Sequence, residues 1–268
     1  MHVNLSARSG AHRITTLAAE SLFGKDRQPK PGAARALERA IDVQRPLVLA
    51  NLRRLRRRNP SATIHELAHV LGRDYLRTVT ATGAAVGTTA AVPGVGTVAA
   101  LGLSTAATVA FLEATALYAQ SIAELHGVTT HDPERSRTMV MAVLMGEEGI
   151  SLVNALLSNP SGRGAPEHWG KVVGQTAPAS VIRSLAGTLR RRFLRRLLAR
   201  QGSALIGRAL PLGVGAVVGG AGNHMMGKAV IRATHSAFGE LPTAVPGELE
   251  SDILAADGAG ETANPPRA

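Results

Sequence analysis

The sequence has no cysteine, and aromatic residues make up only 3% of its 268 residues. The absence of cysteine excludes disulfides and thiolate metal sites. With so few aromatics, Ala and Gly dominate the apolar stretches, although the core of a water-soluble protein usually relies on Leu, Ile, Val and Phe. Small residues instead let two helix backbones approach closely, which is the packing that helices favour inside lipid.

Acidic residues are scarce in two regions. Residues 1–60 carry thirteen Lys or Arg against four acids, and residues 179–208 carry eight Arg and no acid. The tail from Glu240 reverses the sign, with six acids against Arg267. On a chain of net charge +11, two basic blocks indicate contact with a polyanion, either a nucleic acid or an anionic membrane face.

Charge of either sign is absent from two long segments, residues 78–112 and residues 209–227. The first has thirty-five residues. As one helix it would be about 52 Å long, whereas the hydrocarbon core of a bilayer is about 30 Å thick. Pro93-Gly94 interrupts it near the middle, so the sequence predicts a helical hairpin whose first arm ends near Ala91.

The second arm of this hairpin is expected from about Val98 to His126. Gly83 and Gly87 form a GxxxG pair on the first arm, suited to a close helix crossing. The second uncharged segment has similar Pro and Gly positions and is expected to form another hairpin or re-entrant segment. The predicted membrane-hairpin and packing residues are Gly83, Gly87, Pro93, Gly94, Gly96, Pro211, Gly213, Gly215 and Gly219.

Helix signals divide the rest of the chain. Helical periodicity over residues 33–58 is kinked or split by Pro46. Ser61 is the expected N-cap of the next helix, which runs past Leu76. Asp132 as N-cap, followed by Pro133 at the first helical position, predicts an amphipathic helix that runs toward Leu157.

A second basic helix is expected over residues 181–201, with apolar residues along one face and arginines largely off it. Residues 241–268 contain prolines and acids and are expected to be disordered. The predicted organisation is a basic N-terminal region (1–60), a helical domain (61–240) with hydrophobic segments at about 79–119 and 205–227, and an acidic tail (241–268).

The strongest catalytic motif is His65-Glu66-Leu67-Ala68-His69. On a helix, HExxH places two imidazoles on one face for zinc, with Glu66 as general base. The third ligand of the extended motif would fall on Tyr75, which cannot complete that pattern. A zinc-dependent hydrolase using His65, His69 and Glu66 is therefore an alternative hypothesis only, and the favoured interpretation has no metal, no cofactor and no catalytic residue.

Two further patterns concern charge. Glu113 within an apolar helix is a candidate intramembrane acid, because an unpaired carboxylate in lipid costs several kcal/mol, although a surface position where the helix leaves the lipid fits as well. Gln120 and Glu124 follow it on roughly the same helix face. The expected contacts to an anionic surface are Arg190, Arg191, Arg195, Arg196 and Arg200.

The glycine-rich patterns resemble the EcsC-like family of bacterial proteins over about residues 61–240. The resemblance implies membrane association and no reaction: the family is named for a member associated with an ABC transporter, and it has no established catalytic residues. The segments that carry it are residues 75–87, 92–97, 111–114, 124–127, 132–135, 213–223 and 237–238.

Together these features predict an all-α fold, a helical bundle whose Gly/Ala-rich hydrophobic hairpins are embedded in a membrane. The expected function is a non-enzymatic binding or structural protein of the cell membrane, with its basic regions on the cytoplasmic side. Its expected partners are anionic lipid headgroups, and a membrane-protein partner such as a transporter or a second copy of the chain is compatible with this. The remaining alternative is a soluble arginine-rich nucleic-acid binder, which would need aromatics interleaved with the arginines.

Overall fold

The structure is a computed structural model that describes residues 35, 38–89, 97–129, 131–157, 168–204, 214–251 and 253. In this part of the chain all regular structure is helical, which confirms the predicted all-α class. The elements are α3 (Arg45–Arg58), α4 (Ile64–Thr89), α5 (Thr97–Leu125), α6 (Pro133–Met145), α7 (Glu147–Leu157), α8 (Trp169–Lys171), the π-helical turn η1 (Val172–Thr176), α9 (Ala179–Ala204) and α10 (Val214–Phe238).

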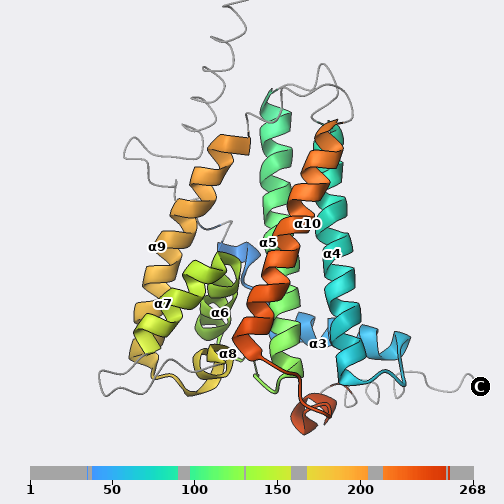
Figure 1. Cartoon of the computed structure of the whole chain (residues 1–268), viewed down its shortest axis with the longest axis vertical. Helices are drawn as coiled ribbons and strands as arrows, with labels where there is room; N and C mark the ends of the chain where they lie inside the picture. The colour runs from blue at the N-terminus through green and yellow to red at the C-terminus, as the bar shows by residue number, and fades with distance from the viewer. Residues whose placement is uncertain are drawn as a thin grey trace, which may run out of the picture.

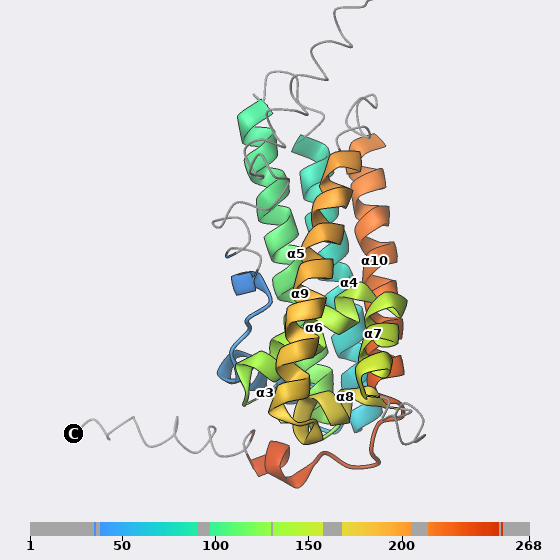
Figure 2. The same ribbon diagram turned by 90° about the vertical axis from the view of Figure 1, so that its left-hand side faces the viewer.

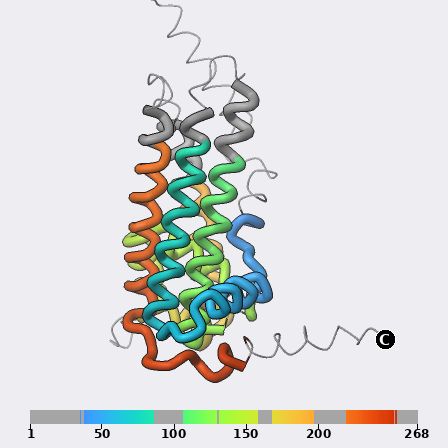
Figure 3. Tube along the Cα trace, turned by 90° about the vertical axis from the view of Figure 1, so that its right-hand side faces the viewer, coloured from blue at the N-terminus to red at the C-terminus, as the bar shows by residue number. Residues whose placement is uncertain are grey.

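The three longest central helices, α4, α5 and α10, lie side by side along the long axis of the molecule (Figure 1). The arms α4 and α5 agree with the predicted hairpin, whose turn, with Pro93, Gly94 and Gly96, lies outside the described residues. On one side of these helices, α9 packs on α6 and α7 (Figure 2). On the other side, α3 crosses the lower part of α4 and α5 (Figure 3). We call the half of the molecule that contains α3, α6, α7 and α8 the base.

The core lies in the base and is centred on α6. From Ser136 onward this short helix is buried on almost every side, and its second half, Met139 to Met145, is apolar all round, as is typical of a buried helix. Trp169, Ile182 and Leu185 pack into the same core from α8 and α9. The buried residues of α6 are Ser136, Thr138, Met139, Val140, Met141, Ala142, Val143 and Met145.

The same core continues across both predicted domain boundaries, at residues 60 and 240. Val48 and Leu52 of α3 belong to it, and so do Leu249 and Ile253 near the C-terminus, which are 2% and 7% exposed. The prediction of disorder from residue 241 is therefore wrong as far as residue 253. Residues 247–251 and 253 are helical, and Leu249 and Ile253, four positions apart, lie on one face of that turn. The surrounding prolines and acids hid this short apolar pattern in the sequence.

Three helix starts and ends differ from the prediction or refine it. Pro46 splits the first helix: α3 begins at Arg45 with Pro46 in its first turn, where proline is well tolerated. The predicted single helix from Asp132 to Leu157 breaks at Gly146, whose positive φ of 61° ends α6 before α7 begins. Gly149 then lies against the backbone of Ala142, so α7 folds back on α6 at close range.

The N-cap of α4 is Thr63 rather than the predicted Ser61. The Thr63 hydroxyl accepts a hydrogen bond from the Glu66 backbone N–H (3.3 Å), and the Glu66 carboxylate accepts one from the Thr63 backbone N–H (2.7 Å). This reciprocal pair is a capping box, with the spacing Thr-x-x-Glu. The start of α4 is therefore fixed by two residues of the chain itself.

The contact between α4 and α10 is the most extensive between any two described helices. A Cβ placed on Gly83 would overlap the backbone carbonyl of Gly219 and lie 2.7 Å from the Asn223 amide nitrogen. The Asn223 side chain donates to the Val79 carbonyl (3.0 Å), which adds a polar link between the helices. The two backbones can approach this closely only because position 83 has no side chain.

We expect Gly83→Ala to lower the free energy of unfolding by about 1–3 kcal/mol, because the methyl group forces two backbones apart. Gly222→Ala is the matched control on α10, since no atom lies within 4 Å of the added Cβ. There the better helix propensity of Ala should raise stability by up to ~1 kcal/mol. Urea unfolding of both variants measures the difference, and equal effects would contradict the close contact.

Candidate functional site

Three of the four long helices, α4, α5 and α10, share one uncharged end, whereas α9 carries arginines as far as Arg200. No Asp, Glu, Lys or Arg occurs in residues 78–89 of α4, 97–112 of α5 or 214–227 of α10. These three stretches, which we call the charge-free end, lie together at the end of the molecule opposite the base (Figure 1). At ~1.5 Å per residue they extend roughly 18, 24 and 21 Å along the axis.

Polar side chains in the charge-free end are used between helices. Asn223 bonds the Val79 carbonyl as described, and the Thr80 hydroxyl lies 3.1 Å from Nδ1 of His224. Thr82 donates to the carbonyl of Thr78 in its own helix (2.9 Å). Small residues at the contact and hydrogen bonds across it are the features that hold helices together where water is excluded.

At the charge-free end, the side chains of residues 78–85, 106–112 and 219–227 are described, and most of the exposed ones are small or apolar. Met225 is 71% exposed, the largest exposure of any large hydrophobic side chain in the described residues. The other exposed apolar residues among these described positions are Ala81, Ala85, Ala106, Ala221, Gly222 and Met226. In the described part of the chain, none of the helices combines the length and apolar character needed to span a bilayer, so the expected transmembrane helices are not found there.

A level of charged residues separates the charge-free end from the base, and we call it the rim. Arg77 lies thirteen residues after the start of α4, Glu113 twelve residues before the end of α5, and Lys228 ten residues before the end of α10. Because these helix ends all lie at the base (Figure 1), the three charges are each about 15–20 Å along the axis from it, at ~1.5 Å per residue. Glu113 is exposed at this rim, on the surface of α5.

The predicted face of Glu113, Gln120 and Glu124 is exposed at one end and buried at the other. Gln120 and Glu124 are 0% and 1% exposed, whereas Glu113 is exposed. The three share a face of α5, but α3 covers α5 only along the base. Burial on this face therefore depends on where α3 packs, and the spacing of residues within α5 gives no information about that.

Glu124 forms a buried ion pair that the sequence analysis missed. Its two carboxylate oxygens accept hydrogen bonds from Nε (2.8 Å) and Nη2 (3.2 Å) of Arg45, at the start of α3. Asn51 of the same helix lies within hydrogen-bonding distance of Ser121 (3.4 Å). The pair fixes α3 across α5, and only its bidentate geometry offsets the cost of burying two charges.

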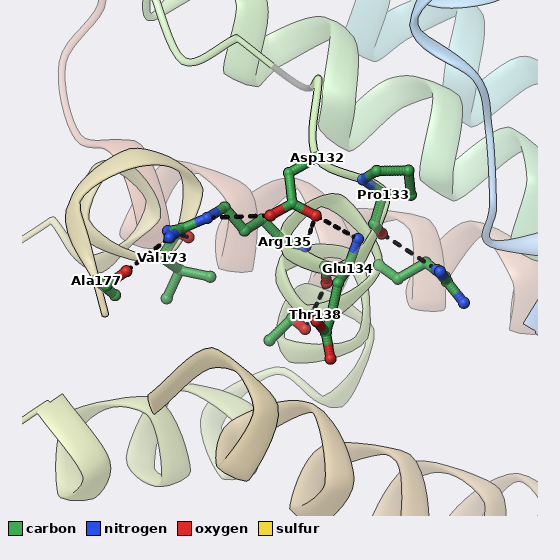
Figure 4. Close-up of polar contacts among 8 residues, drawn as sticks. Asp132, Pro133, Glu134, Arg135, Thr138, Val173 and Ala177 are labelled. Atoms are coloured by element: carbon green, nitrogen blue, oxygen red, sulfur yellow. Dashed lines mark hydrogen bonds and ion pairs between the residues drawn. The ribbon is translucent and has the colours of Figure 1, made fainter. Parts of the chain in front are cut away.

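A second arginine holds the π-helical turn in place. The Asp132 carboxylate caps α6 by accepting from the Glu134 backbone N–H (2.8 Å), which confirms the predicted cap. Arg135 donates to the carbonyls of Val173 (3.1 Å) and Ala177 (2.7 Å), at the two ends of η1 (Figure 4). Its Nε lies 3.3 Å from the Asp132 carboxylate, so the four-residue sequence Asp-Pro-Glu-Arg has a structural role here.

His126 at the base of α5 is half-buried between two carbonyl groups. Nδ1 lies 2.8 Å from the Ile122 oxygen and Nε2 lies 3.3 Å from the Gly239 oxygen. Burial lowers the pKa of His126, and the charges of Lys171 and His235 lower it further, against the opposing effect of the two carbonyls. The folded state therefore favours the neutral imidazole.

The HExxH motif forms the first turn of α4. The Glu66 carboxylate is held by Thr63, and these hydrogen bonds lower its pKa. His65 and His69 are both exposed. Among the described residues no group of three His, Cys, Asp or Glu is arranged to hold a metal ion.

The predicted basic face of α9 is used in two different ways. Arg190 pairs with Glu38 (2.6 Å), and Arg196 donates to the Met145 carbonyl (2.9 Å) and lies 3.4 Å from Glu148. Arg191 and Arg195 are exposed. The side chain of Arg200 and the surroundings of Gly87 and Gly215 are not described, and Pro211 and Gly213 lie outside the described residues altogether.

Comparison with protein-family models, with curated proteins and with solved structures finds no match to this chain. The resemblance to EcsC-like proteins therefore stays a hypothesis. Several residues that carry it have structural roles in the described chain: Gly83 lies at the contact of α4 with α10, and Asp132 and Arg135 fix α6 and η1.

We expect Arg45→Met to lower the free energy of unfolding by about 3–5 kcal/mol, because it removes the arginine that donates two hydrogen bonds to the buried Glu124 carboxylate. Arg77→Met removes the exposed, 3.9 Å pair with Asp74 and should cost less than about 1 kcal/mol. The double variant Arg45→Met, Glu124→Met should recover part of the loss. A double-mutant cycle in urea tests this, and additive single losses would contradict a buried pair.

Since the pKa of His126 is lower in the folded state, the unfolded state takes up its proton first as the pH falls. The contribution of His126 to stability is therefore complete above its unfolded pKa of ~6.5 and is lost below it. We expect His126→Asn to be less stable than wild type at pH 7.5 but to lose less stability between pH 7.5 and 5.5. Thermal unfolding at both pH values measures this, and parallel losses would contradict it.

Proposed function

We propose that this protein is a non-enzymatic, membrane-associated binding protein that inserts its charge-free end into a lipid bilayer. The observation that carries the proposal is the position of the three uncharged helix stretches, which lie together at one end of the molecule. Separated in the sequence, they would be three ordinary apolar segments. Brought together, they form an apolar structure bounded by charges at the rim.

Three features of the described residues at this end suit lipid. Between its first and last turns a helix satisfies its own backbone N–H and C=O groups, which unsatisfied would cost several kcal/mol each in hydrocarbon. Asn223 and Thr80 direct their polar atoms to the contact of α4 with α10. Met225 and the exposed alanines present no charge to the outside.

The dimensions favour partial insertion over a full crossing by these helices. Stretches of roughly 18–24 Å exceed half of a ~30 Å hydrocarbon core but do not equal it. The proposed arrangement therefore has the helices entering from one side, with the rim at the headgroups and the base outside the lipid. By the preference of positive residues for the cytoplasmic face, the base would lie in the cytoplasm, available to a membrane-protein partner such as a transporter.

The test is flotation of the purified protein with phospholipid vesicles. It compares wild type with a single triple variant that carries Ala81→Glu, Ala106→Glu and Ala221→Glu together. All three alanines are exposed, so the fold should tolerate the change, which circular dichroism checks. Each carboxylate in hydrocarbon costs about 2.5–3.5 kcal/mol, so vesicle binding should fall at least a hundredfold.

The matched control places the same three negative charges on the base, as Ala50→Glu, Ala155→Glu, Ser180→Glu. These positions are also exposed. This variant should float like wild type, which separates insertion from bulk charge. Absence of wild-type binding, or equal flotation of the two variants, would refute the proposal.

A further inference from the structure

The arginines of α9 form two sets with different surroundings. The first set faces acids and carbonyls of the protein itself: Arg190 pairs with Glu38, and Arg192 and Arg196 both lie 3.4 Å from Glu148. These three arginines connect α9 to neighbouring segments. They are occupied within the fold and offer little charge to a ligand.

The second set consists of Arg183, Arg191 and Arg195, which are all exposed. With Gly187 they follow one another at four-residue spacing, so they form one ridge of α9. The ridge lies opposite the buried stripe of Leu185, Leu189 and Phe193. Within the described part of the chain, no acid lies within ion-pairing distance of any of these three arginines.

The height of this ridge matches the rim. Arg191 lies twelve residues after the start of α9 at the base, close to the thirteen residues that separate Arg77 from the start of α4. Arg195 lies one turn higher. Arg183 lies two turns lower, roughly 12 Å closer to the base. If the charge-free end enters lipid, Arg191 and Arg195 are at the level of the headgroups, and Arg183 is on the base side of them, outside the membrane.

We propose that Arg191 and Arg195 form a binding site for the phosphate groups of anionic phospholipids; this inference rests on the proposed function. Two planar guanidinium groups one turn apart suit phosphate oxygens, to which each can donate two hydrogen bonds. The arginine pair gives the membrane contact its preference for anionic lipid. The charge-free end supplies the apolar part of the binding.

The surroundings favour lipid over nucleic acid as the source of the phosphate. Single-stranded nucleic acid is held by aromatic side chains on which bases stack, interleaved with basic residues. Trp169, Tyr75 and Tyr118 are all buried, and the large exposed hydrophobic side chains of the described residues are Leu and Met. The arginine ridge therefore offers phosphate contacts without a stacking surface.

The experiment measures partition of the full chain onto vesicles of phosphatidylcholine alone and onto vesicles that also contain phosphatidylglycerol. Each basic residue near an anionic surface contributes about 1 kcal/mol to membrane binding. The double variant with Arg191→Gln and Arg195→Gln should therefore bind the anionic vesicles about 30-fold more weakly. Binding to phosphatidylcholine should not change. The matched control, Arg58→Gln, Arg183→Gln, removes two exposed arginines from the base and should leave both affinities close to wild type.

The outcomes separate the two proposals. Wild-type binding that is equal on both vesicles, or equal losses in the two double variants, would overturn the phosphate site while leaving insertion of the charge-free end intact. Failure of wild type to bind either vesicle would overturn the proposed function and the site with it. Tighter binding to a short DNA at the same salt, lost in the Arg191 and Arg195 variant, would overturn the assignment to lipid.

Discussion

The approach of α4 to α10 at Gly83 sets the arrangement of the other long helices. Because a glycine faces the carbonyl of Gly219, two helices from distant parts of the sequence run in backbone contact over much of their length. With α5 beside α4, this contact brings three uncharged stretches to one end. In the base, the core is completed by α6, which is buried on almost every side.

Local signals in the sequence predicted where helices form better than which helices pack against each other. The hairpin of α4 and α5, the cap at Asp132 and the basic helix α9 follow from charge pattern, proline position and capping chemistry, which act within a few residues. The pairing of α4 with α10 joins residues about 140 positions apart, and no local pattern contains it. The tail was misjudged for a related reason: Leu249 is ordered by a core built from other parts of the chain.

Among the candidate site residues, side chains of the same type have different structural roles, and the neighbouring residues in the fold determine which role each one has. Glu66 belongs to HExxH and also to a Thr-x-x-Glu capping box, and in the structure the second pattern occupies its carboxylate. Glu113 and Glu124 share a helix face, but only Glu124 has an arginine and a covering helix beside it. The arginines of α9 could be listed from the sequence, whereas their division into paired and unpaired sets depended on Glu38 and Glu148.

Among the side chains that the structure describes, Val79, Phe111, Phe193 and Val230 are the last large side chains of the buried core on the four long helices. The described contact of α4 with α10 beyond Val79 is made by small residues such as Gly83 and Gly219. Small residues bury less apolar area than the large side chains around α6. We therefore expect the amides of residues 80–85 and 219–227 to exchange through openings of lower free energy than those of α6.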